Sequence, residues 1–86
     1  MPDSSQGRVT LVLRNSLATS RIVVLEPWSG QYTLNPEETL QIVAAGDVRL
    51  PLEVELFESQ IIVHSFDSEG ATMRIFSNGV EIERSE

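Results

Sequence analysis

Residues 50–66 read LPLEVELFESQIIVHSF, and apolar and polar side chains alternate along both halves of this stretch. A period of two residues is typical of a β-strand with one face in a core and the other in solvent. Two such runs joined by Glu58-Ser59 predict a β-hairpin with a two-residue loop. The predicted register pairs Val54 with Val63, Leu56 with Ile61, and Glu53 with His64.

The rest of the chain repeats this alternation between short turns. Asn78-Gly79 is the dipeptide of a type I′ hairpin turn, because both residues accept a positive φ, and it pairs Ile75 with Ile82 and Arg74 with Glu83. No apolar period of 3.6 residues continues over three turns, so no helix is predicted. The predicted strands cover residues 8–14, 21–26, 31–34, 39–44, 50–57, 60–66, 72–76 and a short segment after Gly79.

These strands predict the fold class. About seven to eight short strands, separated by turns, are typical of an all-β domain, a small antiparallel β-sandwich or barrel. Residues 21–26 are apolar on both faces, as in a central strand, and Pro27 ends that strand because it has no N–H to donate. The length fits one domain, which we expect over residues 8–86, after a disordered tail of residues 1–7.

Composition limits both the chemistry and the partners. The 86 residues include no cysteine and no lysine, which removes thiol nucleophiles, Schiff-base chemistry and cysteine-based metal sites. The net charge of −7 and the scattered arginines disfavour nucleic acid and anionic membranes as partners. Without cysteine, a signal-peptide pattern or an apolar run of about 20 residues, we expect a cytoplasmic protein.

His64 is the only conventional proton shuttle in the sequence. Paired with Glu53 and a nearby serine, it would begin a nucleophilic site, which gives one hypothesis: a small hydrolase or proton-transfer enzyme. No serine lies in a nucleophile-elbow pattern, however. We therefore favour a solvent-facing cross-strand ion pair and expect no catalytic residues.

The acidic residues do not form a recognisable metal motif. The segment Asp67-Ser68-Glu69-Gly70 lacks the twelve-residue spacing of an EF-hand loop, and one histidine cannot supply a structural zinc site. Glu53, Glu55 and Glu58 alternate along a strand or lie at a turn, as on a solvated strand face. We expect neither a metal nor another cofactor.

Two groups of large side chains are candidates for interaction. Trp28 precedes a turn and lies close to Tyr32 in sequence, so it is either a binding anchor or a plug that closes one end of the sandwich. A second group lies on the face that carries His64, where an apolar surplus indicates either an interface, including a symmetric homodimer, or a face covered by a loop. This second group comprises Ile62, Phe66, Phe57 and Pro51.

Residues 25–38, LEPWSGQYTLNPEE, followed by Gln41–Ala44, resemble a set of small uncharacterised bacterial all-β proteins. These carry a Glu-Pro-Trp turn and then a Tyr-x-Leu-x-Pro segment leading into a strand, and the resemblance brings no functional residues with it. Residues 32–39 are also similar to the Leu-x-Pro-Gly-Glu corner of cupredoxin-like sandwiches, with Glu37 in place of the usual glycine. A blue-copper site needs two histidines and a cysteine, and this chain has one histidine and no cysteine, so the resemblance implies a cupredoxin-like sandwich without copper. Within the predicted fold class, the sandwich is either cupredoxin-like or immunoglobulin-like.

Together these observations favour a non-catalytic binding or accessory module that acts through protein–protein contact. The partner is either another protein or a second copy of the chain. The residues that we expect to contact it are Trp28, Tyr32, Phe57, Ile62, His64 and Phe66.

Overall fold

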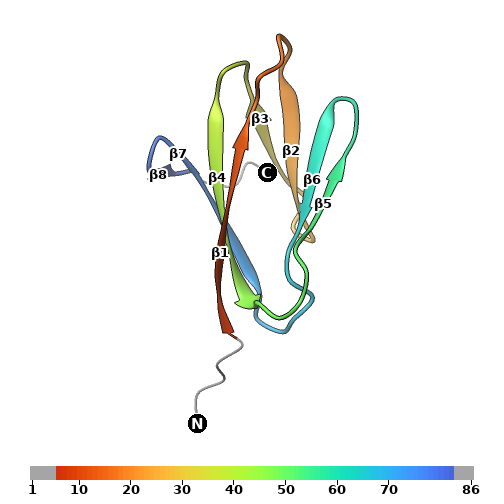
Figure 1. Cartoon of the computed structure of the whole chain (residues 1–86), viewed down its shortest axis with the longest axis vertical. Helices are drawn as coiled ribbons and strands as arrows, with labels where there is room; N and C mark the ends of the chain where they lie inside the picture. Colours follow the sequence, from red (N-terminus) through yellow and green to blue (C-terminus); the bar gives the residue numbers. More distant parts are fainter. Residues whose placement is uncertain (1–5, 83–86) are drawn as a thin grey trace.

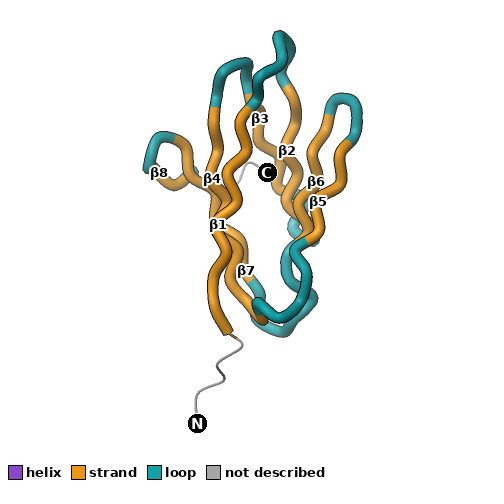
Figure 2. The backbone as a smooth tube through the Cα atoms, in the orientation of Figure 1, coloured by secondary structure: helices purple, strands orange, loops and turns teal. Residues whose placement is uncertain are grey.

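The computed structural model describes residues 6–82, which form eight β-strands and no helix, so the all-β prediction is confirmed (Figures 1 and 2). Within these residues, no helix is long and apolar enough to cross a membrane. The strands are β1 (Gln6–Arg14), β2 (Arg21–Glu26), β3 (Gly30–Leu34), β4 (Thr39–Asp47), β5 (Glu53–Leu56), β6 (Gln60–His64), β7 (Thr72–Ser77) and β8 (Val80–Glu81).

The strands form two four-stranded sheets. The first has the order β1-β4-β7-β8, and the second has the order β3-β2-β6-β5. Figure 1 shows the two sheets on opposite sides of the molecule, as in a sandwich. All neighbouring strands are antiparallel except β2 and β6, which run parallel. A parallel pair needs a long crossover connection, and here the chain visits the other sheet between the two strands.

Inward-facing side chains from both sheets make the core, as the alternating patterns predict. β2 and β6 lie in the middle of the second sheet. β6 buries Ile61 and Val63, the inward positions of the predicted β5–β6 register, and β2 buries three consecutive residues, Val23, Val24 and Leu25. The predicted β5–β6 register is confirmed at all three pairs, and the Phe57 N–H donates to the Gln60 carbonyl to close the two-residue loop. The core comprises Val23, Leu25, Tyr32, Leu34, Leu40, Ile42, Ile61, Val63 and Ile75.

Some strand ends differ from the prediction. β1 begins at Gln6, so residues 6 and 7 belong to the sheet and not to the expected tail, while residues 1–5 lie outside the described part of the chain. β5 covers only residues 53–56 of the expected 50–57. Leu56 is 75% exposed although its register places it on the inward face, because β5 is the last strand of its sheet.

Asn15 is the buried polar residue of the core, with 3% of its surface exposed. Its side-chain Nδ2 donates to the carbonyls of Thr19 and Leu34, both at 2.9 Å, and its Oδ1 accepts from the Leu17 N–H at 3.0 Å. Its backbone N–H donates to Glu38, and its carbonyl accepts from Glu37. Asn15 therefore joins the end of β1 to the end of β3 and to the turn that enters β4, and all its polar groups are satisfied.

The β7–β8 hairpin has the predicted type I′ turn, with φ of 52° at Asn78 and 78° at Gly79. The Ile82 N–H donates to the Ile75 carbonyl at 2.9 Å, as the predicted pairing requires. The expected partner of Arg74, Glu83, lies outside the described residues. Within them, Arg74 makes a bidentate pair with Glu81, with Nε–Oε2 and Nη2–Oε1 distances of 3.0 and 2.5 Å.

Replacing Asn15 by alanine is expected to lower the free energy of unfolding by roughly 2–4 kcal/mol, because it leaves buried carbonyl and N–H groups without partners. Urea denaturation of the two proteins measures the difference. Ser16→Ala, at an exposed neighbouring position, serves as the control and should change stability by less than about 0.5 kcal/mol. Equal stability of Asn15→Ala and the parent chain would contradict this role.

The hydrogen bonds from Arg74 lower the pKa of Glu81 below the ordinary glutamate value. Stability from this pair is therefore present above that ordinary value and is lost as the pH falls through the lowered pKa. In an NMR pH titration, the Glu81 carboxylate should titrate below the ordinary glutamate value. Replacing Arg74 by glutamine should raise the Glu81 midpoint toward the ordinary glutamate value, and an unchanged midpoint would contradict the assignment.

Candidate functional site

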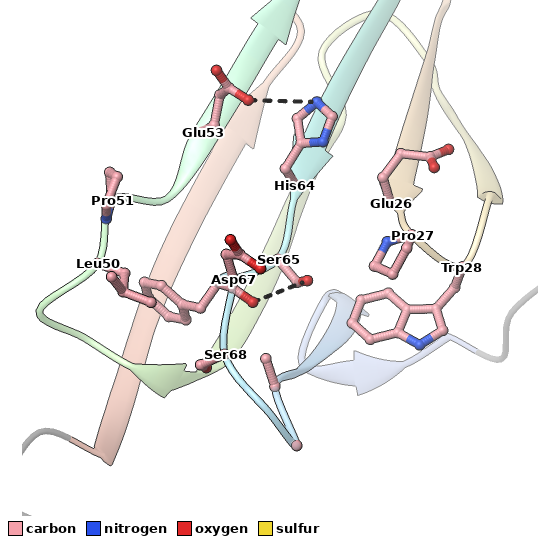
Figure 3. A pocket seen from close by; sticks show the side chains of 13 residues that line it. Glu26, Pro27, Trp28, Leu50, Pro51, Glu53, His64, Ser65, Asp67 and Ser68 are labelled. Atoms are coloured by element: carbon pink, nitrogen blue, oxygen red, sulfur yellow. Dashed lines mark hydrogen bonds and ion pairs between the residues drawn. The ribbon is translucent and has the colours of Figure 1, made fainter.

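A groove of about 950 Å³ lies at the end of the sandwich where β2, β4 and β6 finish. Figure 3 shows its walls: the β2–β3 turn contributes Pro27 and Trp28 on one side, and the β4–β5 connection contributes Leu50 and Pro51 on the other. The segment after β6 lies between them. The groove is lined by Glu26, Pro27, Trp28, Leu50, Pro51, Glu53, His64, Ser65, Phe66, Asp67, Ser68, Gly70 and Ala71.

Phe66 closes the groove toward the core and is only 3% exposed. It was expected on the outward face with Ile62, but β6 ends at His64, and the chain then turns inward. Gly46 of β4 permits this packing, because a Cβ at that position would lie 3.1 Å from the Phe66 Cβ and 2.9 Å from the Ser68 Oγ. Phe66 is therefore not available as an exposed contact for a partner.

Trp28 and Tyr32, the two residues grouped together by sequence, have different surroundings. Tyr32 is 9% exposed and belongs to the core. Trp28 is half-buried, packs against that core and also lines the groove. Trp28 thus closes this end of the sandwich, as one interpretation predicted, while part of the indole remains accessible from the groove.

His64 lies beside two carboxylates, those of Glu53 and Glu55. Figure 3 shows the first of them, with the Glu53 carboxylate directed at the imidazole. Its Nε2 is 2.6 Å from Glu55 Oε1 and 3.9 Å from Glu53 Oε1. Glu53 is the direct cross-strand neighbour, as predicted, but the shorter contact is with Glu55, diagonally across the pair. Diagonal neighbours on paired strands lie within reach of long side chains, so a contact between Glu55 and His64 could have been predicted from the same register.

The serines of the groove do not complete a nucleophilic site. The Ser65 hydroxyl donates to the Phe66 carbonyl at 3.4 Å, and Ser68 Oγ accepts from the Asp47 N–H at 3.2 Å. Among residues 6–82, no serine hydroxyl makes a hydrogen bond to His64. The groove therefore offers a base without an oriented nucleophile.

The outward face of the second sheet is less apolar than expected. Ile62 is half-buried, Phe57 is 49% exposed at the end of the β5–β6 loop, and Phe66 is withdrawn into the core. A dimer through this face would thus rest mainly on Phe57 and Ile62. It stays a prediction.

Carboxylates dominate the polar lining of the groove. The sequence predicted a site at neither Glu26 nor Asp67, and the fold brings both to the same groove as Glu53, from three separate segments. No arginine belongs to the described lining. The described arginines that form ion pairs do so elsewhere: Arg14 with Glu37, Arg49 with Asp47, and Arg74 with Glu81.

We compared the chain with protein families, with curated proteins and with solved structures, and none of them matches it.

Replacing Gly46 by alanine should destabilise the protein by roughly 1–3 kcal/mol, because the added methyl group overlaps Phe66 and Ser68. Urea denaturation measures the change. As a matched control, Ala45→Ser, at the half-buried preceding position, should change stability much less. Wild-type stability of Gly46→Ala would show that the loop after β6 moves aside at no cost.

Proposed function

We propose that this protein is a non-catalytic binding module, and that its groove takes a short basic segment of a partner protein. The observation that carries the proposal is the charge of the groove: the carboxylates of Glu26, Glu53 and Asp67 are not balanced by any arginine among the described lining residues. A partner that supplies the missing positive charge is complementary to this surface.

The shape and the apolar surfaces of the groove support the same partner. Trp28 on one wall, with Leu50 and Pro51 on the other, can contact the aliphatic part of an arginine or lysine side chain while the carboxylates pair with its charged end. An accessible indole also attracts a cation through its π-face. The net charge of −7 would further accelerate the approach of a basic partner at low salt.

The alternative, a hydrolase or proton-transfer enzyme using His64 with Glu53, has less support. Of the two carboxylates near the His64 imidazole, that of Glu53 is the more distant, at 3.9 Å. Among the described residues, no serine hydroxyl makes a hydrogen bond to this imidazole. A cytoplasmic location is part of our proposal. The absence of cysteine suits a reducing compartment.

The single tryptophan makes the proposal directly testable, because Trp28 lines the groove. Titration with a capped hexapeptide of alternating glycine and arginine should change Trp28 fluorescence and saturate, whereas the matching glycine–glutamate peptide should not bind. Replacing both Glu26 by glutamine and Asp67 by asparagine should weaken binding roughly threefold or more, since an exposed charge pair contributes about 0.2–1 kcal/mol.

Glu58→Gln is the matched control, because Glu58 is an exposed acid outside the groove lining. It should leave the affinity within about twofold of the parent. Equal weakening by Glu58→Gln, or equal binding of the acidic peptide, would show non-specific attraction and would overturn the proposal.

A further inference from the structure

We propose that Glu53, Glu55 and His64 form a binding site for a divalent transition-metal ion, with zinc as the physiological example. Each residue offers one ligand atom, and the three atoms all lie within 4.8 Å of one another. The site departs from the sequence-based expectation of no metal, because the fold places the Glu55 carboxylate beside His64 as well as that of Glu53. It goes beyond the proposed binding of a basic segment and does not rest on it.

The β5–β6 hairpin brings the three side chains together. Glu53 and Glu55 alternate along β5, so both point to the same, outward face of the sheet, and His64 of β6 pairs directly with Glu53. The register of this hairpin is set by a two-residue loop and by the inward pairs Val54–Val63 and Leu56–Ile61. The backbone positions of the three ligands are thus determined before any ion binds.

The distances lie close to those of a zinc site. With Zn–N and Zn–O bonds of about 2.0–2.1 Å, two ligand atoms of a tetrahedral ion are separated by about 3.3 Å. His64 Nε2 is 2.6 Å from Glu55 Oε1 and 3.9 Å from Glu53 Oε1, one below and one above that separation. Both glutamates are exposed, so their side chains can rotate to meet an ion without disturbing the core.

Charge favours a cation at this point. Three other acids of the described chain, Glu37, Asp47 and Glu81, each have an arginine partner. Within residues 6–82, no arginine lies within ion-pair distance of Glu53 or Glu55, and His64 is the only basic group beside them. Two neighbouring carboxylates repel each other, and a divalent ion would remove that repulsion while keeping the imidazole neutral as a ligand.

The donor set selects the kind of ion. An imidazole nitrogen with two carboxylate oxygens suits zinc and its neighbours, whereas calcium and magnesium prefer oxygen ligands alone. Three protein ligands leave a coordination position for water or for a group from another molecule. Glu53 and His64 also line the groove, so that position adjoins the groove wall.

Isothermal titration of the metal-free protein with zinc chloride tests the site. We expect saturable binding of one equivalent of zinc, and no comparable binding of magnesium or calcium at the same concentrations. Glu55→Gln and His64→Gln should each weaken zinc binding by about tenfold or more, because each removes one of three ligands. Glu58→Gln, which removes an exposed acid from the loop of the same hairpin, should keep the parent affinity.

A second readout separates ligation from folding and from diffuse attraction. Zinc should shift the NMR signals of the His64 ring in the parent chain and in Glu58→Gln, while circular dichroism shows that the variants keep their β-structure. Absence of saturation, unchanged affinity in His64→Gln, or equal loss in Glu58→Gln would overturn the site. Zinc binding should survive the Glu26→Gln and Asp67→Asn double replacement, which is expected to weaken peptide binding. Failure of the zinc site can therefore be told apart from failure of the groove proposal.

Discussion

Asn15 is a buried amide whose hydrogen bonds hold one end of the sandwich together. A buried polar side chain is costly unless its donors and acceptors are paired, and here each side-chain hydrogen bond is made with the backbone of the β1–β2 connection or with the end of β3. These bonds determine where β1 ends, where β3 ends and how the chain enters β4. β4 then runs to the opposite end of the sandwich, where its Gly46 lies against Phe66.

At that opposite end, β4 contacts the segment after β6 through the packing of Phe66 on Gly46 and through the hydrogen bond from the Asp47 N–H to Ser68 Oγ. The register of β1 with β4 places Arg14 opposite Thr39 at the Asn15 end and Gly7 opposite Gly46 at the other. The missing side chain of Gly46 allows Phe66 to pack against β4. The segment after β6 is thereby drawn inward, which leaves the groove between this segment, the β2–β3 turn and the β4–β5 connection.

The distribution of charge connects this architecture to function. Arg14 of β1, Arg49 of the β4–β5 connection and Arg74 of β7 are paired with nearby acids, and none of them neutralises the groove or the outward face of β5. The surplus of negative charge is therefore concentrated where the fold provides an accessible indole and an imidazole. Both proposals follow from this concentration, one for a basic peptide segment and the other for a metal ion.

The sequence by itself determined the strands and the two local hairpins. Alternation with a period of two residues depends only on neighbouring positions, and so do the Asn78-Gly79 turn and the Glu58-Ser59 loop. For that reason the β5–β6 register and the β7–β8 pairing were predictable, and with them the proximity of Glu53 to His64. Even the shorter Glu55 contact follows from this register once diagonal neighbours are considered.

The tertiary structure decided everything that depends on distant segments. An apolar pattern on both faces of a strand shows that the strand is covered but not which strands adjoin it, so the parallel β2–β6 pair could not be predicted. The alternation of residues 60–66 placed Phe66 with Ile62, whereas the space beside Gly46, twenty residues earlier, drew it into the core. Glu26, Asp67 and Trp28 meet in one groove because of the same β2–β6 pair, which places the β2–β3 turn beside the segment after β6.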